Sequence, residues 1–164
     1  WALEHFDVTP DIVCFGKKSQ VCGIMAGPRI DEVPDNVFRV SSRINSTWGG
    51  RLADMARCEI ILEVMENERL VENAAEVGLH LLRRLEEIEE RFPEKLSNAR
   101  GRGLLCAFDC TSREDRDRLL TKAREKRLLI LPCGERSIRL RPPLNVSREE
   151  VDEAAARLTE ALKA

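Results

Sequence analysis

Apolar residues near the N-terminus occur in two short runs that a polar turn separates. Residues 12–15 read Ile-Val-Cys-Phe and residues 21–26 read Val-Cys-Gly-Ile-Met-Ala, with two lysines in the segment between them. Short apolar runs that are bounded by glycine and polar residues are typical of strands. The pattern therefore predicts a strand, a turn and a second strand within about the first 30 residues.

The middle of the chain changes to helical periodicity. Apolar side chains recur at three- and four-residue spacing from Leu52 to Val64, and again from Val71 to Pro93, where the proline ends the helix. The charged run RRLEEIEER forms the solvated face of the second stretch. We expect Asn67 to cap that second stretch, so the pattern predicts a long linking helical region.

The last third of the chain alternates between short strands and helices. Strands are predicted at 104–109, in LLILPCG and in SIRLRPPL, and helices after Thr111 and after Ser147. A glutamate follows each of these two residues three positions later, which is the pattern of a capping box. This region predicts a small α/β layer, and we expect the part from about Asn98 onward to hold its structure better than the N-terminal strands.

Composition and charge exclude several classes of function. The chain has 164 residues, and its acids and bases nearly balance to a formal net charge of −2. It has no basic block that would indicate a nucleic-acid partner, and no apolar run of the roughly 18 residues that a membrane span needs. We also expect a piece of a longer protein, because the chain begins abruptly at Trp1.

The six cysteines do not indicate a metal site or a disulfide framework. None of them forms a C-x-x-C pair, and both histidines lie far from any cysteine along the chain. Most lie inside apolar runs, where a free thiol behaves as a small hydrophobe. We therefore expect no metal, and a protein of a reducing, cytoplasmic compartment.

The turn between the first two apolar runs holds Lys17 and Lys18. A lysine that attacks an aldehyde must be neutral part of the time and must be held rigidly. A strand end supplies the rigidity, and a dry neighbourhood lowers the pKa of an amine. The alternative is a solvated turn lysine, which is the commoner case for a lysine after a strand.

Four segments resemble, in order, those of the class III pyridoxal-phosphate aminotransferases. PDIVCFGKK resembles the family's lysine signature, and its register favours Lys17 over Lys18 as the residue that carries the cofactor. NSTWGG resembles the stretch whose threonine, here Thr47, reaches the cofactor phosphate of the partner subunit. RGRGLLCAFD resembles the entry into the small domain. SIRLRPPL resembles the strand that grips a substrate carboxylate, with Arg139 favoured over Arg141.

The resemblance implies an α/β fold, the C-terminal part of a fold-type-I pyridoxal-phosphate-dependent transferase. Residues 1–50 would be the end of the large cofactor domain, and residues 51–164 the linking helix and the small C-terminal domain. The four segments most resemble those of the group that moves the terminal amine of free lysine to 2-oxoglutarate. A homodimer is implied, and the family's glycine-rich phosphate loop, ring-stacking aromatic and ring-binding acid have no counterpart here, so we expect this chain alone to be inactive.

Two alternatives remain open. One is another ω-amino acid aminotransferase, acting on 4-aminobutyrate or ornithine, because 4-aminobutyrate aminotransferases share RGRG, the double lysine and the arginine strand. They typically carry Gly-Gly where this chain has Val21-Cys22-Gly23. The other alternative is a non-catalytic module, a truncated chain that retains the small domain for dimerisation.

Overall fold

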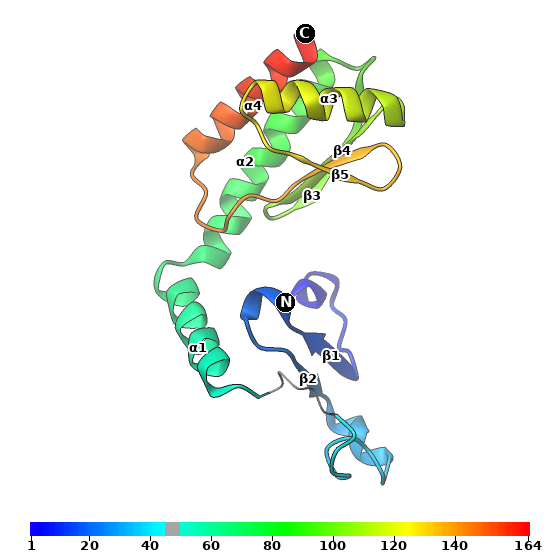
Figure 1. The fold of residues 1–164 in the computed structure, drawn as a ribbon, viewed down its shortest axis with the longest axis vertical. Coiled ribbons are helices and arrows are strands. Elements are labelled where there is room, and N and C mark those ends of the chain that lie inside the picture. The colour runs from blue at the N-terminus through cyan, green and yellow to red at the C-terminus, as the bar shows by residue number, and fades with distance from the viewer. Residues whose placement is uncertain (45–49) are drawn as a thin grey trace. The chain divides into compact units, whose positions relative to one another are not determined.

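The computed structural model describes residues 1–44 and 50–164, and these divide into two compact units. The first unit is Trp1–Met65 and the second is Glu66–Ala164. Figure 1 shows the elements of each unit. Both units combine helices with strands, as the predicted α/β class requires. The predicted domain boundary after residue 50 concerns the longer protein and stays a prediction.

The first unit is built around a two-stranded antiparallel sheet. Its elements are a 3-10 helix at Ala2–Phe6, β1 at Ile12–Phe15, a 3-10 helix at Lys17–Ser19, β2 at Gly23–Ala26, a 3-10 helix at Pro28–Glu32 and α1 at Leu52–Asn67. The prediction of a strand, a turn and a strand is confirmed. A two-stranded sheet has no interior of its own, and Asn36 is the one buried residue among those described here.

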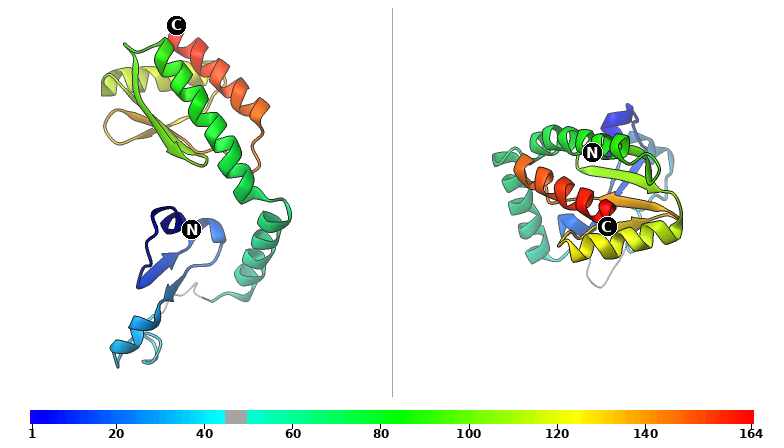
Figure 2. Two further views of the ribbon diagram at one scale, coloured as in Figure 1. Left: turned by 180° about the vertical axis from the view of Figure 1, so that it is seen from behind. Right: turned by 90° about the horizontal axis from the view of Figure 1, so that it is seen from above.

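The second unit is a four-stranded antiparallel sheet with three helices. Its elements are α2 at Leu70–Arg91, β3 at Leu96–Arg102, β4 at Leu105–Cys110, α3 at Arg113–Glu125, β5 at Leu131–Cys133, β6 at Ser137–Leu140 and α4 at Arg148–Lys163. The strand order is β3-β4-β6-β5. Helices α2 and α3 contact the sheet, and α4 packs on both of them (Figure 2).

One face of this sheet is covered by the helices and the other is open. Phe108 and Ile138 pair across β4 and β6 and are fully buried on the helix side. Their neighbours Ala107 and Arg139 pair in the next row and point to the opposite face, because side chains alternate along a strand. The open face is therefore the surface on which Arg139 lies.

Helix α2 belongs to the compact core of the second unit. It buries Val77, Leu81, Leu85 and Ile88, so the compact unit begins near Glu66 and includes this helix together with the part from Asn98 onward, whose greater stability stays a prediction. A Cβ at Gly78 would lie 2.2 Å from the carbonyl carbon of Gly103, so only glycine allows this approach of the helix to the β3–β4 turn.

The observed helix ends confirm one of the three capping predictions and contradict the other two. Ser147 and Glu150 form the predicted capping box at the start of α4. The predicted start after Thr111 is wrong by one residue, because Ser112 is the N-cap of α3 and accepts a hydrogen bond from the backbone of Asp115. Asn67 ends α1 and does not cap α2, which begins at Leu70 after a left-handed residue at Arg69.

Candidate active site

Lys17 lies on a strained turn between β1 and β2. Its φ is 66°, in the left-handed region that lysine rarely adopts, whereas Lys18 has an ordinary negative φ. Two groups of Gln20 hold this turn: its backbone N–H and its side-chain amide both donate to the carbonyl of Lys17, at 3.2 Å and 3.4 Å. Such strain costs about 1 kcal/mol or more and concentrates at functional sites. The backbone therefore distinguishes Lys17 from its neighbour.

The amines of Lys17 and Lys18 are both exposed, and neither has a hydrogen-bonding partner among the described residues. The dry pocket that was expected around the catalytic amine is therefore not formed by the described part of this chain. The Nζ of Lys17 is left available to a group that the rest of the protein or a cofactor would bring.

Gly16 precedes Lys17 for a steric reason. A Cβ at this position would lie 2.8 Å from the Sγ of Cys22, which packs on the turn from the start of β2. The other end of the strand pair is fixed by an ion pair, in which the guanidinium of Arg29 contacts both carboxylate oxygens of Asp11 at 3.0 Å and 3.1 Å. Gly16 thus shapes the turn itself, and Asp11 of the same signature holds the opposite end of the strand pair.

Thr47, the predicted phosphate-binding residue, lies outside the described residues. Lys17 belongs to the first unit and Arg139 to the second. The structure therefore describes the surroundings of Lys17 and Arg139 separately, each within its own unit.

Arg139 lies at the middle of a row that crosses the open sheet face. It pairs with Ala107 of β4 on one side and with Leu131 of β5 on the other. Arg139 and Arg141 are both exposed, and neither has a hydrogen-bonding or ion-pair partner in the described part of the chain. Unpaired guanidinium groups of this kind can bind a carboxylate through two hydrogen bonds.

A cavity of 280 Å³ adjoins these two arginines. Its wall is otherwise mainly apolar and includes Leu131 and Val146, with the carboxylate of Glu150 at the edge where α4 begins. An apolar hollow with a few charged groups suits a small ligand that carries a carboxylate. The wall also includes Leu81 of α2 and Val151 of α4, and the carboxylate-binding role of Arg139 stays a prediction.

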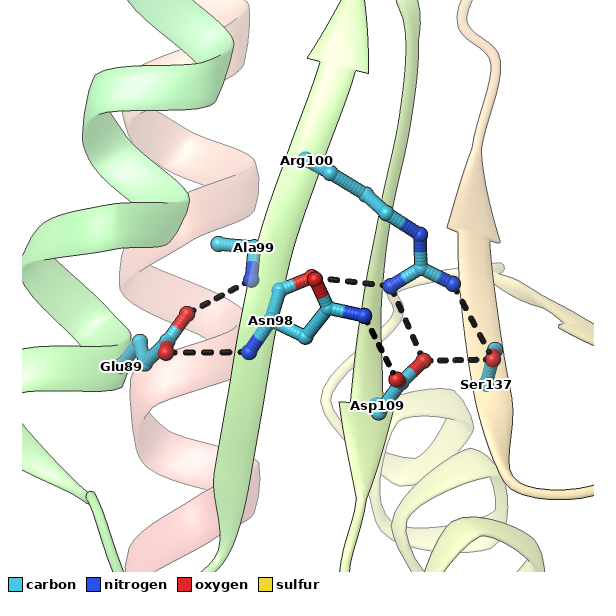
Figure 3. A network of polar contacts seen from close by, with 6 residues as sticks. All are labelled: Glu89, Asn98, Ala99, Arg100, Asp109 and Ser137. Carbon is cyan, nitrogen blue, oxygen red and sulfur yellow. Dashed lines mark hydrogen bonds and ion pairs between the residues drawn. The ribbon is translucent and has the colours of Figure 1, made fainter.

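Sequence reasoning missed a polar network on the same sheet face (Figure 3). The carboxylate of Asp109 accepts hydrogen bonds from Ser137 at 2.6 Å, from the side-chain amide of Asn98 at 2.9 Å and from Arg100 at 2.9 Å. These donors come from β6 and β3, so Asp109 ties three strands together. Only an aspartate at the end of an apolar strand signals it in the sequence.

A carboxylate from α2 fixes the strand irregularity beside this network. The pairing of β3 with β4 shifts between Ser97 and Arg100, and Asn98 has a left-handed φ of 59°. Glu89 accepts the backbone N–H groups of Asn98 at 3.0 Å and of Ala99 at 2.7 Å (Figure 3). The donors that the bulge removes from the ladder are thereby satisfied.

Burial of Asp109 opposes ionisation, but the hydrogen bonds from Ser137, Asn98 and Arg100 and the charge of Arg100 outweigh it. Together they hold the pKa of Asp109 below its ordinary value. The Asp109 side chain is 11% exposed and that of Arg100 is 44% exposed. The network is therefore an ionised and largely buried carboxylate on an inner strand of the sheet, and its cation lies partly in solvent.

The remaining chemistry of the described residues is limited. The six cysteines are free thiols, and burial raises the pKa of Cys106 and of Cys110 to about 11. No group of three metal-ligating side chains is present in residues 1–44 and 50–164. The helices described in these ranges include none that is long and apolar enough to cross a membrane.

The residues present fit a cofactor that carries an aldehyde. A primary amine without a competing partner, on a turn that holds its backbone in one conformation, is what covalent attachment through Nζ requires. Within the described part of the first unit, the fit of such a cofactor depends on this amine alone, because Thr47 lies outside the described residues.

Three comparisons with known proteins agree with this chemistry. Residues 1–162 match the family model "Aminotransferase class-III". An L-lysine-epsilon aminotransferase of Mycobacterium tuberculosis is 52% identical over 162 residues, which are 99% of this chain and 36% of that protein. The mitochondrial 4-aminobutyrate aminotransferase of Sus scrofa is 34% identical over 148 residues, 88% of this chain and 28% of that protein.

A solved structure extends the agreement to the fold. The lysine aminotransferase of M. tuberculosis in the internal aldimine form matches with a TM-score of 0.95 and 52% identity, over 99% of this chain and 38% of that chain. The present chain spans about a third of the length of its curated relatives. The predicted fold, the α/β part of an aminotransferase, is confirmed, and the chain belongs to the class-III aminotransferase family.

Proposed function

We propose that this chain is the C-terminal part of a pyridoxal-phosphate-dependent L-lysine 6-transaminase. The enzyme would transfer the terminal amino group of free lysine to 2-oxoglutarate and release 2-aminoadipate 6-semialdehyde and glutamate. The observation that carries the proposal is the left-handed backbone that distinguishes Lys17 from Lys18, at the position of the family's lysine signature. The names of the relatives at 52% identity support lysine as the amino donor.

Lys17 would hold the cofactor covalently through its Nζ. Pyridoxal phosphate, when bound, supplies the electron sink for a carbanion next to the amino group. Once the donor has taken its place, the freed Nζ of Lys17 would accept the proton from C6 of free lysine. The left-handed turn would keep this amine in one position during the transfer.

The other two predicted residues would bind the ends of the reactants. The guanidinium of Arg139 would bind a carboxylate of 2-oxoglutarate through paired hydrogen bonds, with the adjoining apolar cavity taking its methylene groups. Thr47 would contact the cofactor phosphate of the partner subunit in a homodimer. We place the enzyme in the cytoplasm, as its cysteine usage indicates.

The alternatives make different predictions for the donor. An ω-aminotransferase for 4-aminobutyrate or ornithine would use the same lysine and arginine, and the 34% identity to a 4-aminobutyrate aminotransferase is the observation in its favour. A non-catalytic module would use neither. The donor preference and the covalent cofactor therefore separate all three.

The test begins with the full-length enzyme loaded with pyridoxal phosphate. Borohydride reduction followed by peptide mass spectrometry should place the label on Lys17. Lys17→Ala should remove the label and slow transamination by at least about 10²- to 10⁴-fold, the range of a lost proton-transfer group. Lys18→Ala is the matched control and should keep both.

The same preparation distinguishes the donors. Free lysine should be used with a higher kcat/KM than 4-aminobutyrate or ornithine. A label on Lys18 would contradict the assignment of the lysine, and a preference for 4-aminobutyrate would contradict the assignment of the donor. An unlabelled full-length protein would favour the non-catalytic module.

A further inference from the structure

Two arginines of the open sheet face lie in one row but have opposite surroundings. Arg100 of β3 pairs with Ala107 of β4, and Ala107 pairs with Arg139 of β6. Paired residues of an antiparallel sheet point to the same face, so both arginine side chains start from this face with one alanine between them. Alanine is too short to keep two guanidinium groups apart.

Asp109 draws the guanidinium of Arg100 out of this row. The carboxylate of Asp109 pairs with Nη1 of Arg100 at 2.9 Å, and the same nitrogen donates to the carbonyl of Asn98 at 2.8 Å. The other terminal nitrogen, Nη2, lies 3.3 Å from the hydroxyl of Ser137. Ser137 and Asp109 form a pair two residues along from the Ala107–Arg139 pair, on the same face, and the guanidinium of Arg100 lies beside Ser137 and Asp109 (Figure 3).

The two arginines of this surface therefore differ in whether their charges are paired. Arg100 has an ionic partner and both of its terminal nitrogens are engaged, whereas Arg139 has no partner in the described part of the chain. Without Asp109, the long side chain of Arg100, which is 44% exposed, could turn toward the same carboxylate as Arg139. Two cations would then share one ligand.

We propose that Asp109 is a positioning residue for substrate, which holds Arg100 aside so that Arg139 alone receives the carboxylate of the amino acceptor. The inference rests on the proposed role of Arg139. It assigns to the network a function in the geometry of binding, in addition to joining three strands. A second free guanidinium would bind the anion more tightly but in a displaced position.

In the full-length enzyme, the proposal predicts that loss of the Asp109 charge makes dicarboxylate binding tighter and turnover slower. Asp109→Asn keeps the shape of the side chain but loses the ion pair with Arg100. We expect the variant to bind glutarate, an unreactive dicarboxylate, about three- to tenfold more tightly by calorimetry, as one additional partly exposed cation allows. The kcat and KM for 2-oxoglutarate should fall together, which is the signature of nonproductive binding.

A second substitution separates positioning from stability. In Arg100→Met/Asp109→Asn the released cation is gone, so glutarate affinity and kcat should return to within about twofold of the wild-type values. Ser137→Ala is the matched control, because it removes the hydrogen bonds of Ser137 with Asp109 and with Nη2 of Arg100 but leaves the Arg100–Asp109 ion pair in place. It should keep wild-type glutarate binding even where the melting temperature falls.

Each result that would contradict the proposal is distinguishable from the others by glutarate binding. Weaker glutarate binding in Asp109→Asn that the second substitution does not restore would mean that Asp109 only maintains the strands, and would overturn the proposal, as would no change at all. Arg139→Lys is titrated in parallel. If it weakens glutarate binding while Asp109→Asn has no effect, only the positioning role fails. If the wild-type enzyme does not bind glutarate, the role of Arg139 fails as well.

Discussion

The two units differ most in where their apolar side chains lie. Every buried apolar residue of the described chain, from Val77 to Leu162, belongs to the second unit. The first unit buries Asn36, whose side-chain amide donates to the carbonyls of Ile30 and Val33. One unit is therefore organised around a core and the other around local turns.

Helix α1 makes the difference concrete. It has no buried residue, and its apolar side chains do not gather on one face: Leu52 is 81% exposed and Ile60 is 59% exposed. Helix α2 buries a continuous stripe against β3 and β4. Large apolar side chains that lie exposed on several sides of a helix are typical of a surface that contacts other protein segments. The contrast indicates that the second unit supplies its own stability, while the first presents surfaces that other protein segments normally cover.

The largest stability effect should come from the core of the second unit. Phe108 is 1% exposed, and Phe108→Ala should lower the free energy of unfolding by about 3–5 kcal/mol, because a large cavity replaces the ring. Ile60→Ala in α1 removes a side chain that is mostly exposed, and it should change the same quantity by less than about 0.5 kcal/mol. Chemical denaturation of the 164-residue chain, followed by circular dichroism, measures both.

Equal losses in the two variants would contradict the comparison. They would mean that α1 is buried in solution against a surface that the isolated chain itself provides, for example in a second copy. Repeating the measurement over a range of protein concentrations identifies that case, because the effect of Ile60→Ala would then depend on concentration.

The same contrast explains which elements could be predicted from the sequence. Ser147 with Glu150 and the stripe of α2 carry local signals, and both are confirmed. β3 was missed because it reads Leu-Ser-Asn-Ala-Arg-Gly-Arg, without apolar alternation. Its irregular course depends on Glu89, which lies on another element and accepts the backbone N–H groups of the bulge. Contacts between distant segments leave no periodic trace in the chain.

The candidate site follows the same rule. Lys17 and Arg139 could be named because their flanking residues resemble family motifs, and the strain at Lys17 is an independent structural feature of that position. Asp109 could not be named, because its partners Asn98, Arg100 and Ser137 meet only when β3, β4 and β6 pair. The assignments of Lys17, Thr47 and Arg139 remain predictions until tested in the full-length enzyme.

The second-largest expected effect is on substrate binding, and it distinguishes Arg139 from Arg141 in the second unit. Arg139→Lys should raise the KM for 2-oxoglutarate strongly, because losing a bidentate charge-assisted pair typically costs about 2–5 kcal/mol when a buried partner is stranded. Arg141→Lys should matter less. Steady-state kinetics with full-length enzyme measures both, and the reverse order would show that the register of the arginine strand is shifted by two residues.

The smallest effect concerns the pH dependence of the second unit's stability. The pKa of Asp109 in the folded state lies below its ordinary value, so its ionised form stabilises the fold. That contribution is fully present above the ordinary aspartate pKa of about 3.9, and it is lost as the pH falls through the lower folded-state value. The free energy of unfolding should therefore fall more steeply on acidification in the wild-type chain than in Asp109→Asn. We expect a difference between the two proteins of about 1–2 kcal/mol at pH 7 that shrinks toward pH 3.

Denaturation at several pH values measures this difference in the free energy of unfolding. A difference that is constant with pH would mean that hydrogen-bond geometry, not the charge of Asp109, joins the three strands.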